Sequence, residues 1–261
     1  MTWPTGLLAF LSGLTIATLT TPVGVSGAVF LLPVQLSVLQ VPSPAVTPTN
    51  LLFNVVAGPG ALLRYRSKGR LAGPLTLLLL IGTLPGVVLG AIIRVFAVPG
   101  PRIFRLIVAA VLLPLGLWLT LRALRPIERT TIRAALSDRT TVVLGAAAGT
   151  IGGIYGIGGG SLLGPILAAR GTPISQVAPA VLASTFVTSI AGALSYVVIA
   201  TFTTGDVAPD WSVGLLCGLG GLVGGYLGAR LQPRLPERAL RFLLGALATA
   251  LAGLYTVQAI A

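Results

Sequence analysis

The stretch "GIYGIGGGSLLGPIL", residues 153–167, concentrates glycine in the middle of a long uncharged run, 140–169. Four of the five residues in 156–160 are glycine. Glycine inside a helix costs about 1 kcal/mol relative to alanine, so this stretch predicts a break between two helical segments. Irregular backbone in so apolar a setting is tolerated only where it is buried in protein or lines a cavity. The break is therefore expected inside the protein.

The composition of the chain is that of a membrane protein. Only 8% of its 261 residues are charged, against about 25% in soluble domains. Residues 1–63 carry no charge, and further uncharged runs cover 71–93, 140–169, 171–205, 211–229 and 242–261. A helix needs about 20 apolar residues to cross a bilayer. These runs predict an all-α polytopic membrane protein with the lipid bilayer as its partner.

The net charge of +12 would suggest nucleic acid in a soluble protein. Here the cations cluster in short gaps between apolar runs, as the positive-inside rule describes, so no nucleic-acid partner is expected. The N-terminus lacks the basic region of a cleaved signal peptide. With one cysteine, no histidine and five carboxylates, the chain has little from which to build a metal site or an acid–base pair. We expect no cofactor, no metal and no enzymatic activity.

The sequence contains two copies of one pattern. Shifted by about 132 residues, "GVSGAVFLLP" (24–33) lies over "GIGGGSLLGP" (156–165), and "TNLLFN" (49–54) then lies over "STFVTS" (184–189). The spacing GxxxGxxxGA also occurs twice, at Gly82, Gly86, Gly90 and at Gly220, Gly224, Gly228. We predict a first repeat at 1–125, a basic linker at 126–139 and a second repeat at 140–261.

Each half divides into five apolar segments, of which the first two are short. They are 5–20, 27–40, 44–63, 73–97 and 103–124, then 141–155, 160–169, 177–200, 211–231 and 239–260. Segment 27–40 reaches about 20 Å, less than the roughly 30 Å hydrocarbon core. We therefore predict two repeats, each a broken or re-entrant half-helix pair followed by three transmembrane helices. An odd number of crossings per half gives the repeats inverted topology.

The distribution of the arginines predicts how the chain is oriented in the membrane. With the segment 122–139 in the cytoplasm, most arginines fall inside, while Arg94, Arg102 and Arg105 fall outside. This asymmetry predicts a multi-pass protein of the cell membrane with both termini outside. The outer arginines could draw anions in, although snorkelling is their more ordinary use.

The glycine breaks suggest an anion site without a charged side chain. Each precedes a half-helix, whose N-terminus offers free N–H groups and a positive dipole end. Hydroxyl and amide groups on the segment after each half-helix are candidate partners, and Ser26 and Ser161 suit the N-cap position. Tyr155 could gate the break or simply pack. The candidate substrate-binding residues are Gly24, Ser26, Gly27, Thr49, Asn50, Asn54, Tyr155, Gly156, Gly158, Gly159, Gly160, Ser161, Ser184, Thr185 and Thr188.

Two other features favour structural roles. The two GxxxGxxxGA faces are typical of close helix packing, either within the chain or between two copies, so a homodimer stays open. Cys217 is expected to be a small buried hydrophobe.

At these residues the chain resembles the TauE/SafE family of sulfite and organosulfonate transporters, over nearly its whole length. The resemblance rests on "GIGGGSLLGPIL" (156–167), its weaker copy at 24–33, the Ser/Thr stretches that follow and the two-half layout. It implies a secondary transporter of small sulfur-containing anions such as sulfite, often working by export. Ala28 and Val29 stand where the second half has Gly160 and Ser161, so the two half-sites are expected to contribute unequally.

No Asp, Glu or His lies deep in a predicted span, although proton-coupled carriers usually titrate such a group there. We hypothesise that any proton moves on the substrate, as bisulfite, or that transport is uncoupled. A channel for a small anion or solute is one alternative. A membrane-embedded lipid phosphatase is another, but Arg139 and Arg170, the cations nearest to 153–160, are both placed at the interface.

Overall fold

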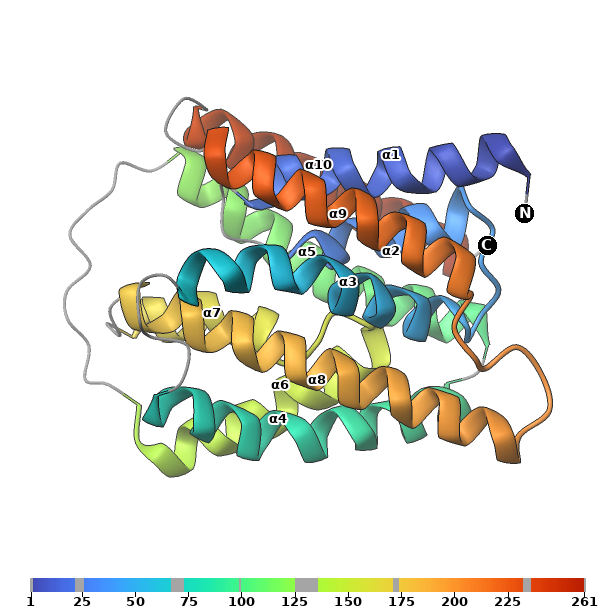
Figure 1. The fold of residues 1–261 in the computed structure, drawn as a ribbon, viewed down its shortest axis with the longest axis horizontal. Helices are drawn as coiled ribbons and strands as arrows, with labels where there is room; N and C mark the ends of the chain where they lie inside the picture. Colours follow the sequence, from blue (N-terminus) through green and yellow to red (C-terminus); the bar gives the residue numbers. More distant parts are fainter. Residues whose placement is uncertain are drawn as a thin grey trace.

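The computed structural model describes residues 2–21, 26–66, 73–98, 100–124, 136–170, 174–231 and 236–260. The regular structure in these ranges is helical. The helices form one bundle, and the N-terminus and the C-terminus lie on the same side of it (Figure 1). The helices are α1 (Trp3–Thr20), α2 (Gly27–Ser37), α3 (Val46–Arg66), α4 (Pro74–Ile92), which continues as a short π-helix η2 (Ile93–Ala97), α5 (Pro101–Leu124), α6 (Asp138–Tyr155), α7 (Gly160–Ala169), α8 (Ile174–Phe202), α9 (Trp211–Leu231) and α10 (Glu237–Ile260).

The predicted all-α membrane fold is confirmed. Among the described residues six helices are long and apolar enough to cross a bilayer, namely α1, α4 with η2, α5, α8, α9 and α10. Helices α7 and α9 begin and end at the predicted residues. The expectation that the first segment of each half is short was wrong, because α1 and α6 each have 18 residues, or about 27 Å at 1.5 Å per residue. Only α2 and α7, with 11 and 10 residues, are short.

The glycine faces bring helix backbones into contact. A Cβ atom at Gly82, Gly86 or Gly90 of α4 would lie 2.3 Å from a carbonyl oxygen of α6, those of Val142, Ala146 and Thr150 in turn. A Cβ atom at Gly220, Gly224 or Gly228 of α9 would likewise lie 2.0 to 2.6 Å from the carbonyl oxygens of Phe10, Leu14 and Thr18 in α1. The faces therefore serve packing within the chain, which removes the reason to assign them to a homodimer.

These two interfaces correspond residue by residue. The partners Phe10 and Val142 are 132 positions apart in the chain, and Gly82 and Gly220 are 138 apart, as in the sequence alignment of the two halves. The fourth helix of each half thus packs on the first helix of the other half.

Helices α5 and α10 run antiparallel and hold each other at both ends. Arg102, in the first turn of α5, donates to the carbonyl of Ala259 at the end of α10. Arg238, in the first turn of α10, donates to the carbonyl of Ala123 at the end of α5. Each cation therefore meets carbonyls at the negative end of its partner helix, where it is stabilising.

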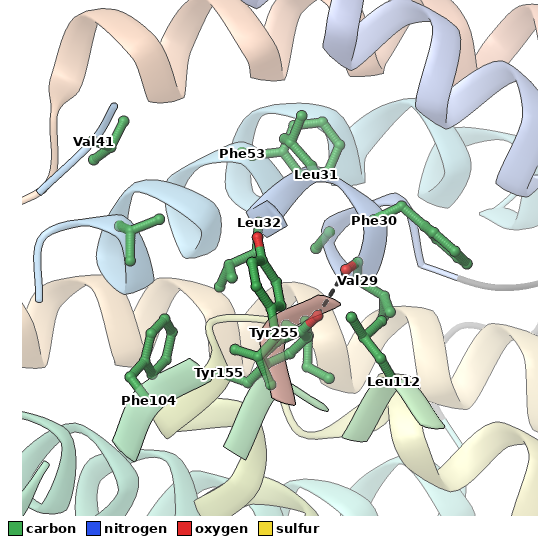
Figure 2. Close-up of a cluster of buried hydrophobic side chains, with 14 of the residues drawn as sticks. Val29, Phe30, Leu31, Leu32, Val41, Phe53, Phe104, Leu112, Tyr155 and Tyr255 are labelled. Atoms are coloured by element: carbon green, nitrogen blue, oxygen red, sulfur yellow. Dashed lines mark hydrogen bonds between the residues drawn. The ribbon is translucent and has the colours of Figure 1, made fainter. Parts of the chain in front are cut away.

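The short helix α2 lies inside the bundle. Its residues Phe30, Leu31 and Leu32 are buried on successive sides of the helix and join the main apolar cluster (Figure 2). Helix α2 has no charged side chain, and its one amide side chain, Gln35, is fully buried too, so the helix has no polar face to present to water and is stable inside the other helices.

Candidate functional site

The predicted break between α6 and α7 is present and depends on glycine. Helix α6 ends at Tyr155, and Gly156 follows in the left-handed conformation with φ +84°. The N–H of Gly156 donates to the carbonyl of Gly152 at 2.8 Å. Gly158 is left-handed as well, with φ +73°. Residues with a Cβ atom rarely adopt this conformation, so the chain can stop and restart a helix here only with glycine.

The glycines also let neighbouring helices reach the backbone of the break. A Cβ atom at Gly156 would lie 2.5 Å from the carbonyl oxygen of Thr47 in α3. A Cβ atom at Gly158 would lie 2.9 Å from Ser189 Oγ and 3.0 Å from Thr185 O, both in α8. The break is therefore enclosed by α3 and α8, the third helix of each half.

The polar side chains predicted in the second half converge on this break. The N–H of Gly159 donates to Thr188 Oγ1 at 3.2 Å. Thr185 Oγ1 lies 3.4 Å from Ser161 Oγ and is close enough to Gly160 that a Cβ atom there would be 2.6 Å away. The Ser184 hydroxyl contacts a different helix: it lies 3.1 Å from Thr83 Oγ1 of α4. Helix α8 thus lines the start of α7 with hydroxyl groups.

Ser161 does not cap α7 as predicted, because the helix already begins at Gly160. The Ser161 hydroxyl instead donates back to the carbonyl of Ile157 at 2.9 Å. Ser26 does occupy the N-cap position of α2, but its side chain makes no capping hydrogen bond.

Three buried polar atoms near the crossing of α3 and α8 have no hydrogen-bond partner among the described residues. They are Asn50 Oδ1, Asn54 Nδ2 and Ser189 Oγ. The two helices cross antiparallel, with Leu51 against Gly192 and Gly58 against Phe186, so Asn54 and Ser189 lie at the same level. They also occupy the same position, the last, in the two matching stretches 49–54 and 184–189. A buried polar group without a partner costs free energy, and native proteins rarely leave one in place unless it binds something.

The remaining first-half candidates are used partly by the fold. Asn50 Nδ2 donates to the carbonyl of Ala28 at 2.9 Å, which ties α3 to the first turn of α2. Thr49 Oγ1 donates to Ala45 O and accepts the N–H of Asp210 at 2.8 Å, so it joins α3 to the start of α9 and does not face the break. Gly27 packs against Phe53 and Thr20. Gly24 lies outside the described residues.

Tyr155 packs and does not stand free at the break. Its side chain is fully buried, and its hydroxyl donates to the carbonyl of Val29 in α2 at 2.8 Å (Figure 2). Tyr155 therefore ties the end of α6 to the short helix α2. Cys217 is fully buried in α9, as predicted for a small hydrophobe.

Arg94 is the functional candidate that sequence reasoning missed. It was expected in an outer loop, yet its side chain is fully buried in η2. Its Nε donates to Thr47 Oγ1 at 3.2 Å, and its terminal nitrogens donate to Val98 O and Ser43 Oγ. The guanidinium carbon lies 3.9 Å from the centre of the Phe104 ring. A buried arginine and one that snorkels to the membrane surface can both have apolar sequence neighbours. The sequence around Arg94 therefore does not reveal that its side chain is buried.

The described residues offer no metal site, because no three of their His, Cys, Asp or Glu side chains gather in one place. A groove of about 400 Å³ lies elsewhere, between α4 and α8, with mainly apolar lining that includes Val88, Ile92 and Leu194. Its lining does not suit an anion. The polar cluster at the break is therefore the candidate site.

Comparison with known proteins identifies the family of this chain. A family model described as "Sulfite exporter TauE/SafE" matches residues 9–255, nearly the whole length. No curated protein matches the chain. The family consists of membrane transporters and not enzymes, which excludes the lipid phosphatase alternative. With its all-helical fold, its six helices able to cross a bilayer and this match, the chain belongs to the TauE/SafE family of membrane sulfite and sulfur-anion exporters.

Proposed function

We propose that this protein is a secondary transporter that exports sulfite, bisulfite or small organosulfonates and binds them at the break between α6 and α7. The observation that carries the proposal is a glycine break lined by the hydroxyls of Thr185, Thr188 and Ser189 inside an apolar helix bundle. A hydroxyl such as that of Thr185 or Ser189 can donate a hydrogen bond to an oxyanion without holding a competing negative charge, whereas the Thr188 hydroxyl already donates to Ser184 O at 2.7 Å and holds the Gly159 N–H in place. The N-terminus of α7 adds a positive dipole end that favours an anion.

The unpartnered atoms favour a ligand at the crossing of α3 and α8. Asn54 Nδ2 is a donor and Ser189 Oγ can act as one, and both are buried without a partner in the described structure. A bound oxyanion would accept from both, whereas an empty site leaves their hydrogen-bonding capacity unused. These two atoms support a proposed anion position between α3 and α8, next to Gly158.

The symmetric interfaces support the inverted repeat that we propose for residues 1–125 and 140–261. Helix α4 packs on α6 as α9 packs on α1, through equivalent glycines and equivalent carbonyls. In inverted-repeat transporters a site at the repeat interface opens to either side as one half rocks against the other. We propose the same here, with the segment 122–139 in the cytoplasm and both termini outside the cell membrane.

Proton movement is proposed to occur on the substrate. The chain has no histidine, and its described acidic residues stand at helix ends or in a loop, at Asp138, Asp206, Asp210 and Glu237. A carrier without an intramembrane carboxylate or histidine has no ordinary side chain with which to couple a proton. Bisulfite can carry its own proton, and the only other option is uncoupled transport.

The function is tested by uptake of radiolabelled sulfite into proteoliposomes, with and without an imposed pH gradient. Saturable uptake that follows the gradient supports bisulfite as the moving species, and saturable uptake that ignores it supports a uniporter or exchanger. A fast ohmic anion current would instead favour a channel. No uptake of sulfite or of small sulfonates above that of empty liposomes would contradict the proposal.

Ser189→Ala separates binding from folding. Because the Ser189 hydroxyl is buried without a partner, removing it should leave the thermal midpoint unchanged or higher. Loss of one hydrogen bond to a charged ligand, about 1.5–3 kcal/mol, should raise the KM for sulfite about tenfold or more. The measurements are uptake kinetics and thermal unfolding of the purified protein.

The matched control is Ser195→Ala, six residues further along α8. The Ser195 hydroxyl already donates to the carbonyl of Ala191 at 2.8 Å, so its loss should leave the KM for sulfite unchanged. A Ser189→Ala protein that transports with wild-type KM would place the anion elsewhere.

A further inference from the structure

The two helix ends at the break between α6 and α7 do not by themselves fix the sign of the electrostatic potential there. Helix α6 brings its negative carbonyl end to the same place where α7 brings its positive N–H end. An anion there would be repelled by one and attracted by the other. The sign of the local potential therefore depends on which groups compensate the end of α6.

The last carbonyls of α6 are taken by donors from other helices. Tyr196 of α8 donates through its hydroxyl to Gly153 O at 2.9 Å. Thr47 of α3 donates through Oγ1 to Ile154 O at 3.1 Å. Two buried side chains thus cover the carbonyl end of α6, and Thr47 is also the residue whose own carbonyl lies against Gly156.

Arg94 lies directly behind Thr47, with its Nε 3.2 Å from Thr47 Oγ1. It is the one charged side chain that the described residues bury completely, and no carboxylate among them contacts it. A buried charge without an opposite charge is costly, and an ionisable residue within a membrane span is usually functional. One residue, Thr47, therefore separates an uncompensated cation from the break.

We propose that Arg94 supplies the fixed positive charge of the anion site and that the transported anion is its counter-ion. This inference rests on the proposed function of the break as the anion site. Because Arg94 is the single fully buried cation in the described structure, it can neutralise one negative charge. A second charge on the substrate would remain unpaired in a low-dielectric interior. The carrier therefore selects monoanions, bisulfite over sulfite and singly charged sulfonates over dianions.

The surroundings of Arg94 bring no other charge into this balance. From α3, α5 and the preceding loop it is faced by Thr47, Phe104 and Ser43, which are neutral. Tyr196 of α8 is the titratable side chain that interacts with it, and the Tyr196 hydroxyl is committed to Gly153 O. A pH dependence of sulfite transport is thus expected to come from the substrate.

The first test compares Arg94→Gln and Arg94→Lys in proteoliposomes, with Arg139→Gln, an exposed arginine, as the control. Methanesulfonate, a monoanion at all relevant pH values, is the probe. Arg94→Gln should raise its KM about tenfold or more, as expected for losing the one buried unit charge near the site in a low-dielectric protein interior. Arg94→Lys should recover most of the affinity, and Arg139→Gln should match wild type. A folded Arg94→Gln protein with wild-type KM would overturn the proposal.

A second test needs no variant and so does not depend on the folding of Arg94→Gln. At constant total sulfite, wild-type uptake should fall as pH rises through the bisulfite–sulfite equilibrium, while methanesulfonate uptake stays level. Sulfite uptake that instead rises with the dianion fraction would overturn the selection of monoanions.

Anion-dependent thermal stabilisation of the purified protein distinguishes failure of this inference from failure of the proposed function. If sulfite and methanesulfonate are not transported, but methanesulfonate or nitrate stabilises wild type and not Arg94→Gln, the sulfur-anion function falls and the role of Arg94 stands. If uptake occurs and stabilisation is equal in both proteins, the role of Arg94 falls alone. If none of these anions stabilises the wild-type protein or is transported by it, both the proposed function and the role of Arg94 are refuted.

Discussion

Gly158→Ala is expected to abolish saturable anion uptake, with a loss of about a hundredfold or more. Gly158 has φ +73°, and an added Cβ atom would lie 2.9 Å from Ser189 Oγ and 3.0 Å from Thr185 O. The left-handed conformation costs a residue with a Cβ atom about 1–2 kcal/mol, and overpacking adds about 1–3 kcal/mol. Relief requires the break to move away from α8, which separates the N-terminus of α7 from the hydroxyls proposed to share the anion.

The measurement is initial uptake against sulfite concentration, alongside the thermal midpoint of each purified protein. Gly205→Ala is the control, because Gly205 also has positive φ, +111°, but has nothing within 4 Å of an added Cβ atom. It should lose a little stability and keep wild-type kinetics. Wild-type uptake by Gly158→Ala would refute the placement of the anion site at this break.

Gly86→Ala and Gly224→Ala are expected to lower the stability of the folded protein at positions away from the proposed site. The added Cβ atoms would lie 2.3 Å from Ala146 O and 2.2 Å from Leu14 O. Both oxygens belong to helix backbone, so no rotamer change relieves the contact and the helices must separate. Overpacking of this kind costs about 1–3 kcal/mol, and each substitution should lower the thermal midpoint by several degrees.

The control for this pair should change stability in the opposite direction. Gly253 lies exposed in α10 with nothing within 4 Å of an added Cβ atom. Gly253→Ala should raise stability by about 1 kcal/mol, because alanine is the better helix former. Similar losses for Gly86→Ala and Gly224→Ala would support the repeat, since the two glycines are equivalent in it. Wild-type stability of either would show that its two helices can separate without cost.

The helices themselves could be predicted from the sequence. Uncharged runs long enough to cross a bilayer mark them, and α7 and α9 have the predicted bounds. The break at 156–160 was predictable for a local reason, because four glycines in five residues cannot hold a helix. The packing role of the two GxxxGxxxGA faces followed from spacing alone, since residues four apart lie on one side of a helix.

The polar residues of the site were predictable as a group and not individually. Thr185, Thr188 and the break converge as expected. Thr49 and Tyr155 instead form hydrogen bonds that stabilise the fold, with the backbone of Asp210 and of Val29. A hydroxyl serves a ligand or a backbone carbonyl equally well, so only its neighbours in space decide its use.

Arg94 shows most clearly what only the tertiary structure decided. Along the chain it reads as a cation at the edge of an apolar run, where a snorkelling side chain would reach water. In the folded protein its partners Ser43 and Thr47 come from residues about 50 positions earlier, and Phe104 covers its face. Hydropathy is a property of each segment by itself and determined where helices form. Whether a charge is buried depends on which segments meet around it, and that is a property of the assembled bundle.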